Sequence, residues 1–261
     1  MLMENERDYT ISAVKKALNI LKLFNEDTQE LTLSQVSSLS GIGKSSILRM
    51  LYTLVNEGFL EYDEDTRKYS LGFELFRLGQ IKYAALDIRK IARKYLKPVC
   101  DQNNLIGYLA VRHGDDLAMV EQVFPYKVPL WSQLLIQDNL RALYSTGIGR
   151  LFLAQESDEA VEQYLDRVPI TPFTKETITD KATLKELIRQ ARSDGYSGNV
   201  GENEDLICSI CAPIYNQSGL MIAGVSLCGP HDVIWGGNFD QRLALVKQVA
   251  RDISRELGYS G

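Results

Sequence analysis

The cysteines near the carboxyl-terminal end have the residue types and spacing of a zinc site. Cys208-x-x-Cys211 is followed, after sixteen residues, by Cys228-x-x-His231, and thiolate and imidazole ligands at such spacings typically hold Zn²⁺. The first pair lies in a strand-like segment, where residues three apart point to opposite faces. The two residues between its cysteines are Ser-Ile, without the glycine that a zinc knuckle needs. We therefore expect no metal ion and no other cofactor.

Two further patterns that could support catalysis are incomplete. Gly43-Lys44-Ser45 resembles the end of a P-loop, but that motif needs a glycine where this chain has Ser38, and it needs a preceding strand where this chain has a helical pattern. The two histidines, His113 and His231, do not lie beside a nucleophile motif such as G-x-S-x-G. We expect neither nucleotide hydrolysis nor hydrolase activity, and we interpret the protein as a non-enzyme.

One face of residues 44–58, KSSILRMLYTLVNEG, has side chains that suit contact with DNA. Lys44, Ser45 and Ser46 open this face and Arg49 continues it; short hydroxyls permit close approach to bases, and arginine binds a guanine edge or a phosphate. The alternative is an ordinary solvated face. The opposite face has the spacing of a helix that packs on a core, and its residues are Ile47, Leu48, Leu51, Leu54 and Val55.

Two helices are predicted before this segment. Apolar residues recur at helical spacing from Ile11 to Phe24, with Ser12 available as the N-cap. A second helix begins after Thr32, because Thr32 and Gln35 have the spacing of a capping box, and it ends in the turn 40–43. Two short helices joined by a glycine-containing turn are typical of a helix-turn-helix.

A hairpin is predicted directly after Gly58, which closes the segment 44–58. Residues 59–62 and 68–72 alternate as two strands joined by a polar turn, which is the pattern of a wing. Arg67 and Lys68 lie at its tip, where they could contact sugar-phosphate or the minor groove. The alternative is a turn that is only solvated.

Composition sets limits on these interpretations. The chain has 261 residues, 45% hydrophobic and 24% charged, as expected of two globular domains. It has no membrane-length apolar run and begins with a polar, partly acidic segment, so we expect neither a membrane span nor a leader peptide. Four cysteines suggest reduced thiols in the cytoplasm. Residues 1–79 hold 9 basic and 12 acidic residues, a balance of −3, so DNA binding requires a local positive face.

The residues from Leu31 to Gly72 resemble the DNA-binding domain of the IclR family of bacterial regulators. The marks are the leucine-rich second helix, the Lys-Ser-Ser start of the third and the Gly-Phe-Leu entry to the wing. AVKKAL is similar to the family's first helix, where a basic residue corresponds to Lys16. The residues expected to contact DNA are Lys16, Thr32, Lys44, Ser45, Ser46, Arg49, Arg67 and Lys68.

The resemblance continues through LYSTGIGRLFLA, TPFTKETITD, DGYSGNVGENE and CSICAPIYNQSGLMIAGVSLCGP, and covers about four-fifths of the chain. It implies a GAF-like sensor fold for the C-terminal domain. Three residues depart from the family's pattern: Ala142 stands where proline is usual, Tyr144 where histidine is frequent and Leu206 where glycine is frequent. The first two flank the expected effector site.

A linker helix is predicted between the two halves. Leu78, Ile81, Ala85, Ile88, Ala92 and Tyr95 are spaced as the seam of a coiled coil. The helix could pair with a second subunit or dock on the chain's own core; a break is possible near Asp87, and we expect its end before Pro98. The predicted organisation is a winged helix-turn-helix at 1–79, a linker helix at 80–97 and an effector-binding domain at 98–261.

The C-terminal sequence predicts an α+β domain, with an antiparallel sheet flanked by helices. Hairpins are expected at 108–123 and 208–228, and helices near 146–155, 158–167, 181–193 and 240–257. Strand alternation places Ser209 with Cys211 on one face, and Ser226 with Cys228 on one face of the partner strand. Such small polar groups could line a cavity or pack tightly. By resemblance, the expected effector-binding residues are Leu143, Thr146, Gly147, Asn199, Ser209, Ser226 and Cys228.

Together these observations predict a cytoplasmic, DNA-binding transcriptional regulator. Its expected partners are double-stranded operator DNA, a small organic effector with a carboxylate as one possible class, and further copies of itself as a homodimer or tetramer. Repression is the expected mode, although the sequence leaves activation open. Two alternatives remain: a small-molecule enzyme with an accessory helix-turn-helix, and a winged helix that binds protein instead of DNA.

Overall fold

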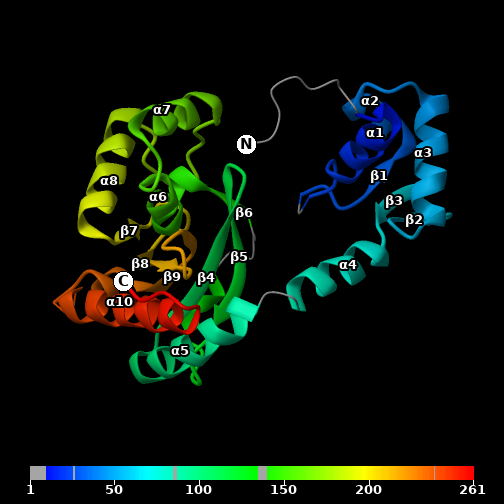
Figure 1. Cartoon of the computed structure of the whole chain (residues 1–261). Coiled ribbons are helices and arrows are strands. Elements are labelled where there is room, and N and C mark those ends of the chain that lie inside the picture. The colour runs from blue at the N-terminus through cyan, green and yellow to red at the C-terminus, as the bar shows by residue number, and fades with distance from the viewer. Residues whose placement is uncertain (1–9, 26, 85–86, 135–139, 238) are drawn as a thin grey trace. The chain divides into compact units, whose positions relative to one another are not determined.

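The computed structural model describes residues 10–25, 27–84, 87–134, 140–237 and 239–261. The chain divides into two compact units, Met1–Ala85 and Leu86–Gly261. The first is mainly helical with a small sheet, and the second packs helices on both faces of a larger sheet (Figure 1). The chain is therefore α+β, as the sequence predicts.

The N-terminal unit has the order of a winged helix-turn-helix. Its elements are α1 (Ser12–Leu21), β1 (Leu31–Thr32), α2 (Leu33–Ser40), α3 (Lys44–Asn56), β2 (Leu60–Asp63), β3 (Lys68–Leu71) and α4 (Phe73–Ala84). The wing strands β2 and β3 pair in antiparallel fashion, and β1 adds a third strand on the other side of β3. Glu61 pairs with Ser70 and Asp63 with Lys68, so the polar turn closes the hairpin as predicted.

Local signals fix the boundaries of α2. The capping box forms, because the Thr32 side chain accepts from the Gln35 backbone and the Gln35 side chain accepts from the Thr32 backbone N–H. Gly41 ends the helix in the left-handed conformation, with φ of 67°. The prediction for α1 was wrong in one detail: Ile11 is its N-cap, without a side-chain cap, and Ser12 is the first helical residue.

The core of this unit is formed by one apolar stripe from each helix and by the wing. Ile20, Val36, Ile47, Leu51 and Leu60 are almost fully buried together. The stripe predicted for α3 was too wide, because Leu48 is 52% exposed. A helix of 13 residues that packs mainly through residues 47, 51 and 54 leaves the rest of its circumference in solvent.

The predicted linker segment contains two helices, divided near Asp87, where the sequence analysis allowed a break. Helix α4 ends at Ala84 and α5 (Asp87–Asn103) begins three residues later, while residues 85 and 86 lie outside the described part of the chain. The predicted seam is split accordingly. Leu78 and Ile81 of α4 are exposed, whereas Ala92 of α5 is fully buried in the C-terminal core. For the second half of the seam, docking on the chain's own core is the correct alternative.

The predicted helix end before Pro98 was also wrong, because α5 continues through Pro98 to Asn103. An internal proline removes one backbone hydrogen bond and costs about 3 kcal/mol. Leu96 and Cys100, on either side of Pro98, are both 0% exposed, and burying a large apolar side chain contributes about 1.5–3 kcal/mol. The packing of the helix on the sheet therefore outweighs the local cost.

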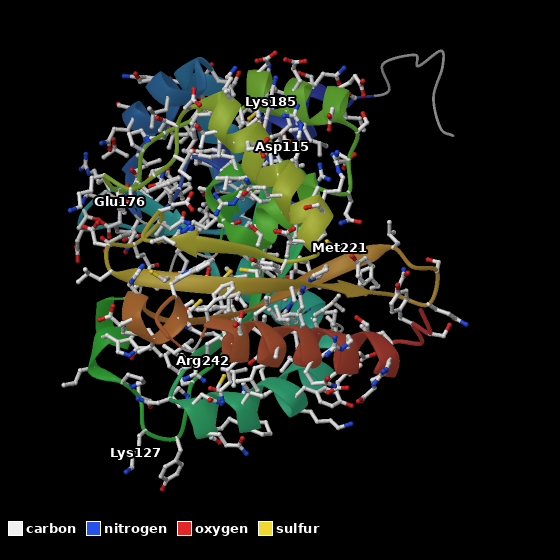
Figure 2. The ribbon with its side chains drawn as sticks, turned by 90° about the vertical axis from the view of Figure 1, so that its left-hand side faces the viewer. Asp115, Lys127, Glu176, Lys185, Met221 and Arg242 are labelled. Atoms are coloured by element: carbon white, nitrogen blue, oxygen red, sulfur yellow. The ribbon has the colours of Figure 1, made fainter. Side chains whose placement is uncertain are left out.

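The C-terminal unit is built on a six-stranded antiparallel sheet with the order β6-β5-β4-β9-β8-β7. Figure 2 shows the sheet nearly edge-on, with Arg242 of α10 on one side and Lys185 of α8 on the other. The strands are β4 (Ile106–His113), β5 (Asp116–Val123), β6 (Leu140–Ala142), β7 (Ser197–Val200), β8 (Ile207–Tyr215) and β9 (Met221–Pro230). The helices that follow α5 are η1 (Leu130–Leu134), η2 (Leu143–Ser145), α6 (Gly147–Leu153), α7 (Asp158–Arg167), α8 (Lys181–Asp194), α9 (His231–Ile234) and α10 (Phe239–Glu256).

Each face of this sheet has its own core. Cys208, Ile210 and Leu227 pack with α5 and α10 on one face. Cys211 packs with α6 and α8 on the other. The opposite placement of Cys208 and Cys211 confirms the alternation argument, and the described residues contain no group of three or more metal-ligating side chains.

One residue of the C-terminal unit has a strained backbone. Leu206, which stands where the family frequently has glycine, has a φ of 69° and a side chain that is 73% exposed. A left-handed conformation costs an L-residue about 1–2 kcal/mol, and an exposed leucine recovers little of this by packing.

We therefore expect Leu206→Gly to stabilise the C-terminal unit by about 0.5–1 kcal/mol, since the relief of strain exceeds the entropic cost of glycine. Chemical denaturation followed by circular dichroism measures the change. The matched control is Leu220→Gly, because Leu220 is 62% exposed but is not among the residues with positive φ. Equal destabilisation by both substitutions would contradict the strain argument.

Candidate functional sites

The polar face of α3 is open to solvent. Lys44, Ser45, Ser46 and Arg49 are all exposed, and the described structure gives their side chains no ion-pair partner. Gly43 is the N-cap and provides no side-chain cap, so short side chains surround the start of the helix. This geometry suits insertion of the helix start into the major groove, where N-terminal residues of a recognition helix reach base edges.

The other predicted DNA contacts differ in how freely their side chains can act. Lys16 on α1 and Arg67 at the wing tip are exposed, and Arg67 holds a left-handed φ of 56°. The hydroxyl of Thr32 is engaged in the capping box and donates to Gln35 Oε1 at 2.8 Å. Thr32 thus positions α2, with both its hydroxyl and its backbone N–H bonded to Gln35 Oε1.

Lys68 is held by an acidic neighbour that the sequence did not reveal. Its Nζ lies 2.8 Å from Glu30 Oε2, and both side chains are about half exposed. The hydrogen bond to Glu30 raises the pKa of the Lys68 ammonium. Glu30 therefore competes with any phosphate that approaches this side of the wing.

In the C-terminal unit, the predicted effector residues come together on the α6 side of the sheet. Two rows of directly opposed residues cross the strands there. One row joins Asn199 of β7, Ser209 of β8 and Cys228 of β9. The other joins Cys211 of β8, Ser226 of β9 and Tyr108 of β4. Directly opposed residues of an antiparallel sheet share a face, so hydroxyls and thiols alternate across this surface.

Several of these predicted residues are already committed to the protein's own structure. Asn199 donates through Nδ2 to the Ser145 carbonyl at 2.8 Å and accepts from the Glu202 N–H at 3.1 Å. The Thr146 hydroxyl caps α6 by accepting from the Gly149 N–H at 3.0 Å. Leu143 is fully buried. These residues shape the site. In the described part of the chain, the hydroxyls of Ser209 and Ser226 each contact only a cysteine of their own strand, at 3.7 Å.

Gly147 is required by close packing over the sheet. A Cβ at this position would lie 2.6 Å from Cys211 Sγ and 3.2 Å from the Gly198 backbone. The amide of the next residue, Ile148, donates to the Cys211 thiol. The amides of Ile148 and Gly149, in the first turn of the seven-residue helix α6, thus have protein partners.

The sequence analysis missed the charged members of this cluster. Arg141 lies opposite Leu117 of β5 and so shares the face of the α6 core. Its Nη2 is 3.8 Å from Glu204 Oε1, and these side chains are 12% and 14% exposed. Arg141 lies in a three-residue strand and Glu204 in a loop, and neither element gives a periodic signal.

Tyr108 lies opposite Ser226 on the same face of the sheet. Its hydroxyl accepts a hydrogen bond from Gln122 Nε2 at 2.6 Å. Burial raises the pKa of the Tyr108 hydroxyl strongly, Cys228 and Glu204 add to this, and Arg141 opposes it. The phenol is therefore neutral near pH 7 and can both donate and accept hydrogen bonds.

A second arginine-glutamate pair involves the loop between β7 and β8, which also carries Glu204. Arg150 of α6 is 1% exposed and forms two hydrogen bonds to the Glu202 carboxylate, at 2.9 and 2.8 Å, with another to the Gly198 carbonyl. The Thr177 hydroxyl donates to the Glu202 carbonyl at 2.6 Å. Removing one partner of such a buried pair typically costs about 3–5 kcal/mol, so this pair acts as scaffold.

The residue that replaces the family's frequent histidine has a structural role. Tyr144 is fully buried, and its hydroxyl donates to the Thr171 carbonyl at 3.0 Å and accepts from the Thr171 N–H at 2.8 Å. This exchange ties the Thr-rich segment to η2. Tyr144 therefore cannot offer its hydroxyl to a ligand without releasing that segment.

All four cysteines are buried and reduced. Burial raises the pKa of the Cys100 and Cys211 thiols to about 12, and it raises the pKa values of Cys208 and Cys228 as well. At neutral pH they are protonated, weakly nucleophilic thiols.

Comparison with known proteins follows the same two-part division. Residues 13–64 match the IclR helix-turn-helix domain, and residues 82–255 match the C-terminal domain of bacterial IclR transcriptional regulators. The chain belongs to the IclR family. It is a transcriptional regulator with an N-terminal, DNA-binding helix-turn-helix.

Individual relatives span nearly the whole chain. The transcriptional regulator KipR of Bacillus subtilis is 31% identical over 248 residues, which cover 95% of this chain and 97% of KipR. XynR of Escherichia coli is 28% identical over 252 residues, 95% of this chain and 98% of XynR. Both proteins are named as HTH-type transcriptional regulators.

Solved structures have the same fold. An IclR transcriptional regulator from Alicyclobacillus acidocaldarius has a TM-score of 0.77 at 25% identity, with 95% of this chain and 99% of that chain covered. An IclR homologue from Microbacterium hydrocarbonoxydans, solved in complex with 4-hydroxybenzoate, has a TM-score of 0.75 at 24% identity and covers 94% of this chain and 99% of its own. In the described part of this chain, no helix has the length and apolarity of a membrane span.

For the recognition helix, we expect Arg49→Ala to weaken binding to DNA upstream of the gene's own operon by about 1–3 kcal/mol and to relax selectivity at one base position. A uniform loss across sequences would mean that Arg49 binds phosphate only. Gel shifts measure both, and Lys22→Ala is the control, because Lys22 is exposed but lies outside the predicted contacts. Unchanged affinity in the double variant Lys44→Ala/Arg49→Ala would refute the assignment of α3.

For the wing, we expect Glu30→Gln to tighten DNA binding several-fold at about 100 mM salt. The substitution releases the Lys68 ammonium and removes a carboxylate that repels phosphate, so the plot of log affinity against log salt should steepen by about one unit. In a Lys68→Met background the same substitution should leave the slope unchanged. Weaker binding by Glu30→Gln alone would show that Lys68 needs Glu30 for its placement.

Proposed function

We propose that this regulator represses transcription by binding operator DNA through residues 1–79 and that an organic effector bound by residues 98–261 changes its affinity for the operator. The observation that carries the proposal is the cluster of buried polar side chains on the α6 face of the sheet. Asn199 is 7% exposed, Ser226 5% and Cys228 7%. Buried polar groups cost free energy unless they serve structure or ligand binding.

Some hydroxyls of the cluster have only weak hydrogen-bond partners within the protein, which supports the binding of a ligand there. The side chains of Asn199 and Thr146 form hydrogen bonds to backbone atoms of nearby residues. Ser209 and Ser226, by contrast, contact sulfur, a weak partner, within their own strands. The 4-hydroxybenzoate complex of the Microbacterium relative supports a small organic molecule, with a carboxylate included, as the class of effector.

Helix α5 is the element best connected to transmit the effector's presence. Glu121 of β5 is 6% exposed and faces α5, where Arg89 Nη2 lies at 2.6 Å and Arg93 Nη1 at 3.0 Å from its carboxylate. Its chain neighbour Gln122 faces the effector side and donates to Tyr108. A ligand that binds more tightly to one position of strand β5 therefore also favours one position of α5. An effector changes DNA binding through such a difference in its affinity for two conformations of the protein.

A homodimer is part of the proposal. One winged helix offers a small base-reading surface, and paired copies read paired half-sites. Phe73, Phe76 and Ile81 of α4 are each more than half exposed, and an apolar row of this kind suits burial against a second copy. The cytoplasm is the compartment in which such a regulator meets its DNA.

The experiment that tests the effector site is Ser226→Phe in the full-length protein. The ring would project among Tyr108, Cys211 and their neighbours, and we expect it to abolish the change in operator affinity caused by an effector drawn from a panel of small organic acids. DNA binding without effector should change less than twofold, as measured by fluorescence anisotropy.

The control is Ser193→Phe, because Ser193 is exposed on α8 and its hydroxyl bonds to Gln190 and Asp194, outside the predicted effector residues. It should leave the effector response intact. A folded Ser226→Phe protein that responds fully would place the effector elsewhere and would refute the proposed site.

A further inference from the structure

Two large apolar side chains lie on the solvent-facing side of α3. Leu48 is 52% exposed and Tyr52 is 67% exposed. They are four residues apart in the helix, so their side chains are neighbours on its surface. A single exposed apolar side chain is ordinary on a protein surface, whereas adjoining large ones indicate a surface that a partner covers.

The geometry of α3 places these two residues in one patch with predicted DNA contacts. The helix packs on the core of its unit through Ile47, Leu51 and Leu54. On the other side, an exposed patch consists of Ser45, Leu48, Arg49 and Tyr52. The spacing of these four residues is i, i+3, i+4 and i+7, which forms one continuous surface of a helix. We call this surface the α3 patch.

Charge favours DNA over a second copy of the chain as the occupant of the α3 patch. Arg49 lies within the patch and Lys44 precedes its first residue, and both side chains are exposed. Contact between the α3 patches of two copies would bring these positive charges together, which is unfavourable. DNA instead supplies phosphates to both cations.

The apolar half of the patch matches one feature of the major groove. Thymine presents its C5-methyl group there, while the other groups that the base edges present are hydrogen-bond donors and acceptors. Ser45 and Arg49 suit those polar groups or phosphates. The leucine side chain and the aromatic ring beside them suit the methyl group, because burial of apolar surface is favourable.

From this arrangement we infer that Leu48 and Tyr52 select thymine in the operator by burying its methyl group. The inference rests on the proposed binding of α3 in the major groove and adds two specificity-determining residues to it. Residues 45 to 52 extend about 10 Å along the helix axis, close to three base-pair steps. The thymine therefore lies within about three base pairs of the position at which Arg49→Ala relaxes selectivity.

The test removes the methyl group from the DNA and leaves the base pairing unchanged. The full-length regulator first selects its operator from a library of random duplexes, and each thymine of a half-site is then replaced by uracil in turn. Fluorescence anisotropy measures the affinity for each duplex. At one or more of these positions we expect uracil to weaken binding by about fourfold, the factor that corresponds to burial of one methyl group.

Variants assign the effect of the methyl group to the α3 patch. The double variant Leu48→Ser/Tyr52→Ser should bind the thymine and uracil duplexes equally well. Tyr52→Phe retains the ring and should retain the difference. The matched control is Leu18→Ala, because Leu18 is 53% exposed but lies on α1, and it should also retain the difference. The two duplexes are compared within each variant, so a uniform loss of affinity does not affect the result.

Two sets of results overturn the inference. It fails if no uracil replacement within about three base pairs of the Arg49-dependent position weakens binding, or if Leu48→Ser/Tyr52→Ser retains the difference. It also fails if Tyr52→Phe abolishes the difference, since the hydroxyl is then the contact, or if the double variant is monomeric by light scattering while the wild type is dimeric, since the patch then binds a second copy.

The variant Lys44→Ala/Arg49→Ala separates this inference from the proposal on which it rests. If that variant binds DNA as tightly as the wild type, the binding of α3 in the major groove fails and the thymine contact fails with it. If that variant binds more weakly but the methyl group has no effect, α3 remains the recognition helix and only the thymine contact is wrong.

Discussion

The alternation of side chains along the β-strands governs what each part of the C-terminal unit can do. Both faces of the six-stranded sheet are covered by helices, so most strand residues contribute to one of two separate interiors. The face toward α5 and α10 is mainly apolar, apart from Glu121 with Arg89 and Arg93 of α5, and gives the unit its main core. The face toward α6 and α8 carries serines, thiols and charged groups. A shift of one residue in β8 or β9 would exchange these two surfaces.

Most buried groups of the polar face have partners within the protein, and these partners offset the free-energy cost of burying them. Arg150 and Glu202 neutralise each other, and Asn199 joins η2 to the loop after β7. This rigid surround leaves the pair Arg141 and Glu204 at the border of the cluster, where exposure is slightly greater.

Much of this arrangement could be predicted from the sequence. The capping box at Thr32, the wing, the bounds of α7 and the two hairpins follow from local spacing, and strand parity correctly placed Cys208 and Cys211 on opposite faces of the sheet. Pro98 was misjudged because a local penalty was weighed without the burial of Leu96 and Cys100. Arg141, Glu204 and the partnership of Glu30 with Lys68 were out of reach, because such contacts join segments far apart in the chain and leave no periodic trace.

The burial of the four cysteines has a practical consequence. All of them lie in the unit Leu86–Gly261, and their thiols are shielded from solvent in the folded state. A thiol reagent can modify them only when that unit opens. The rate of modification therefore reports the opening of the C-terminal unit and does not depend on the opening of the DNA-binding unit. A ligand that stabilises the C-terminal unit would slow the reaction. The rate of thiol modification in the wild-type chain therefore measures the opening of the C-terminal unit alone. A single cysteine introduced at an exposed position of the N-terminal unit would react without any opening and would label that unit selectively.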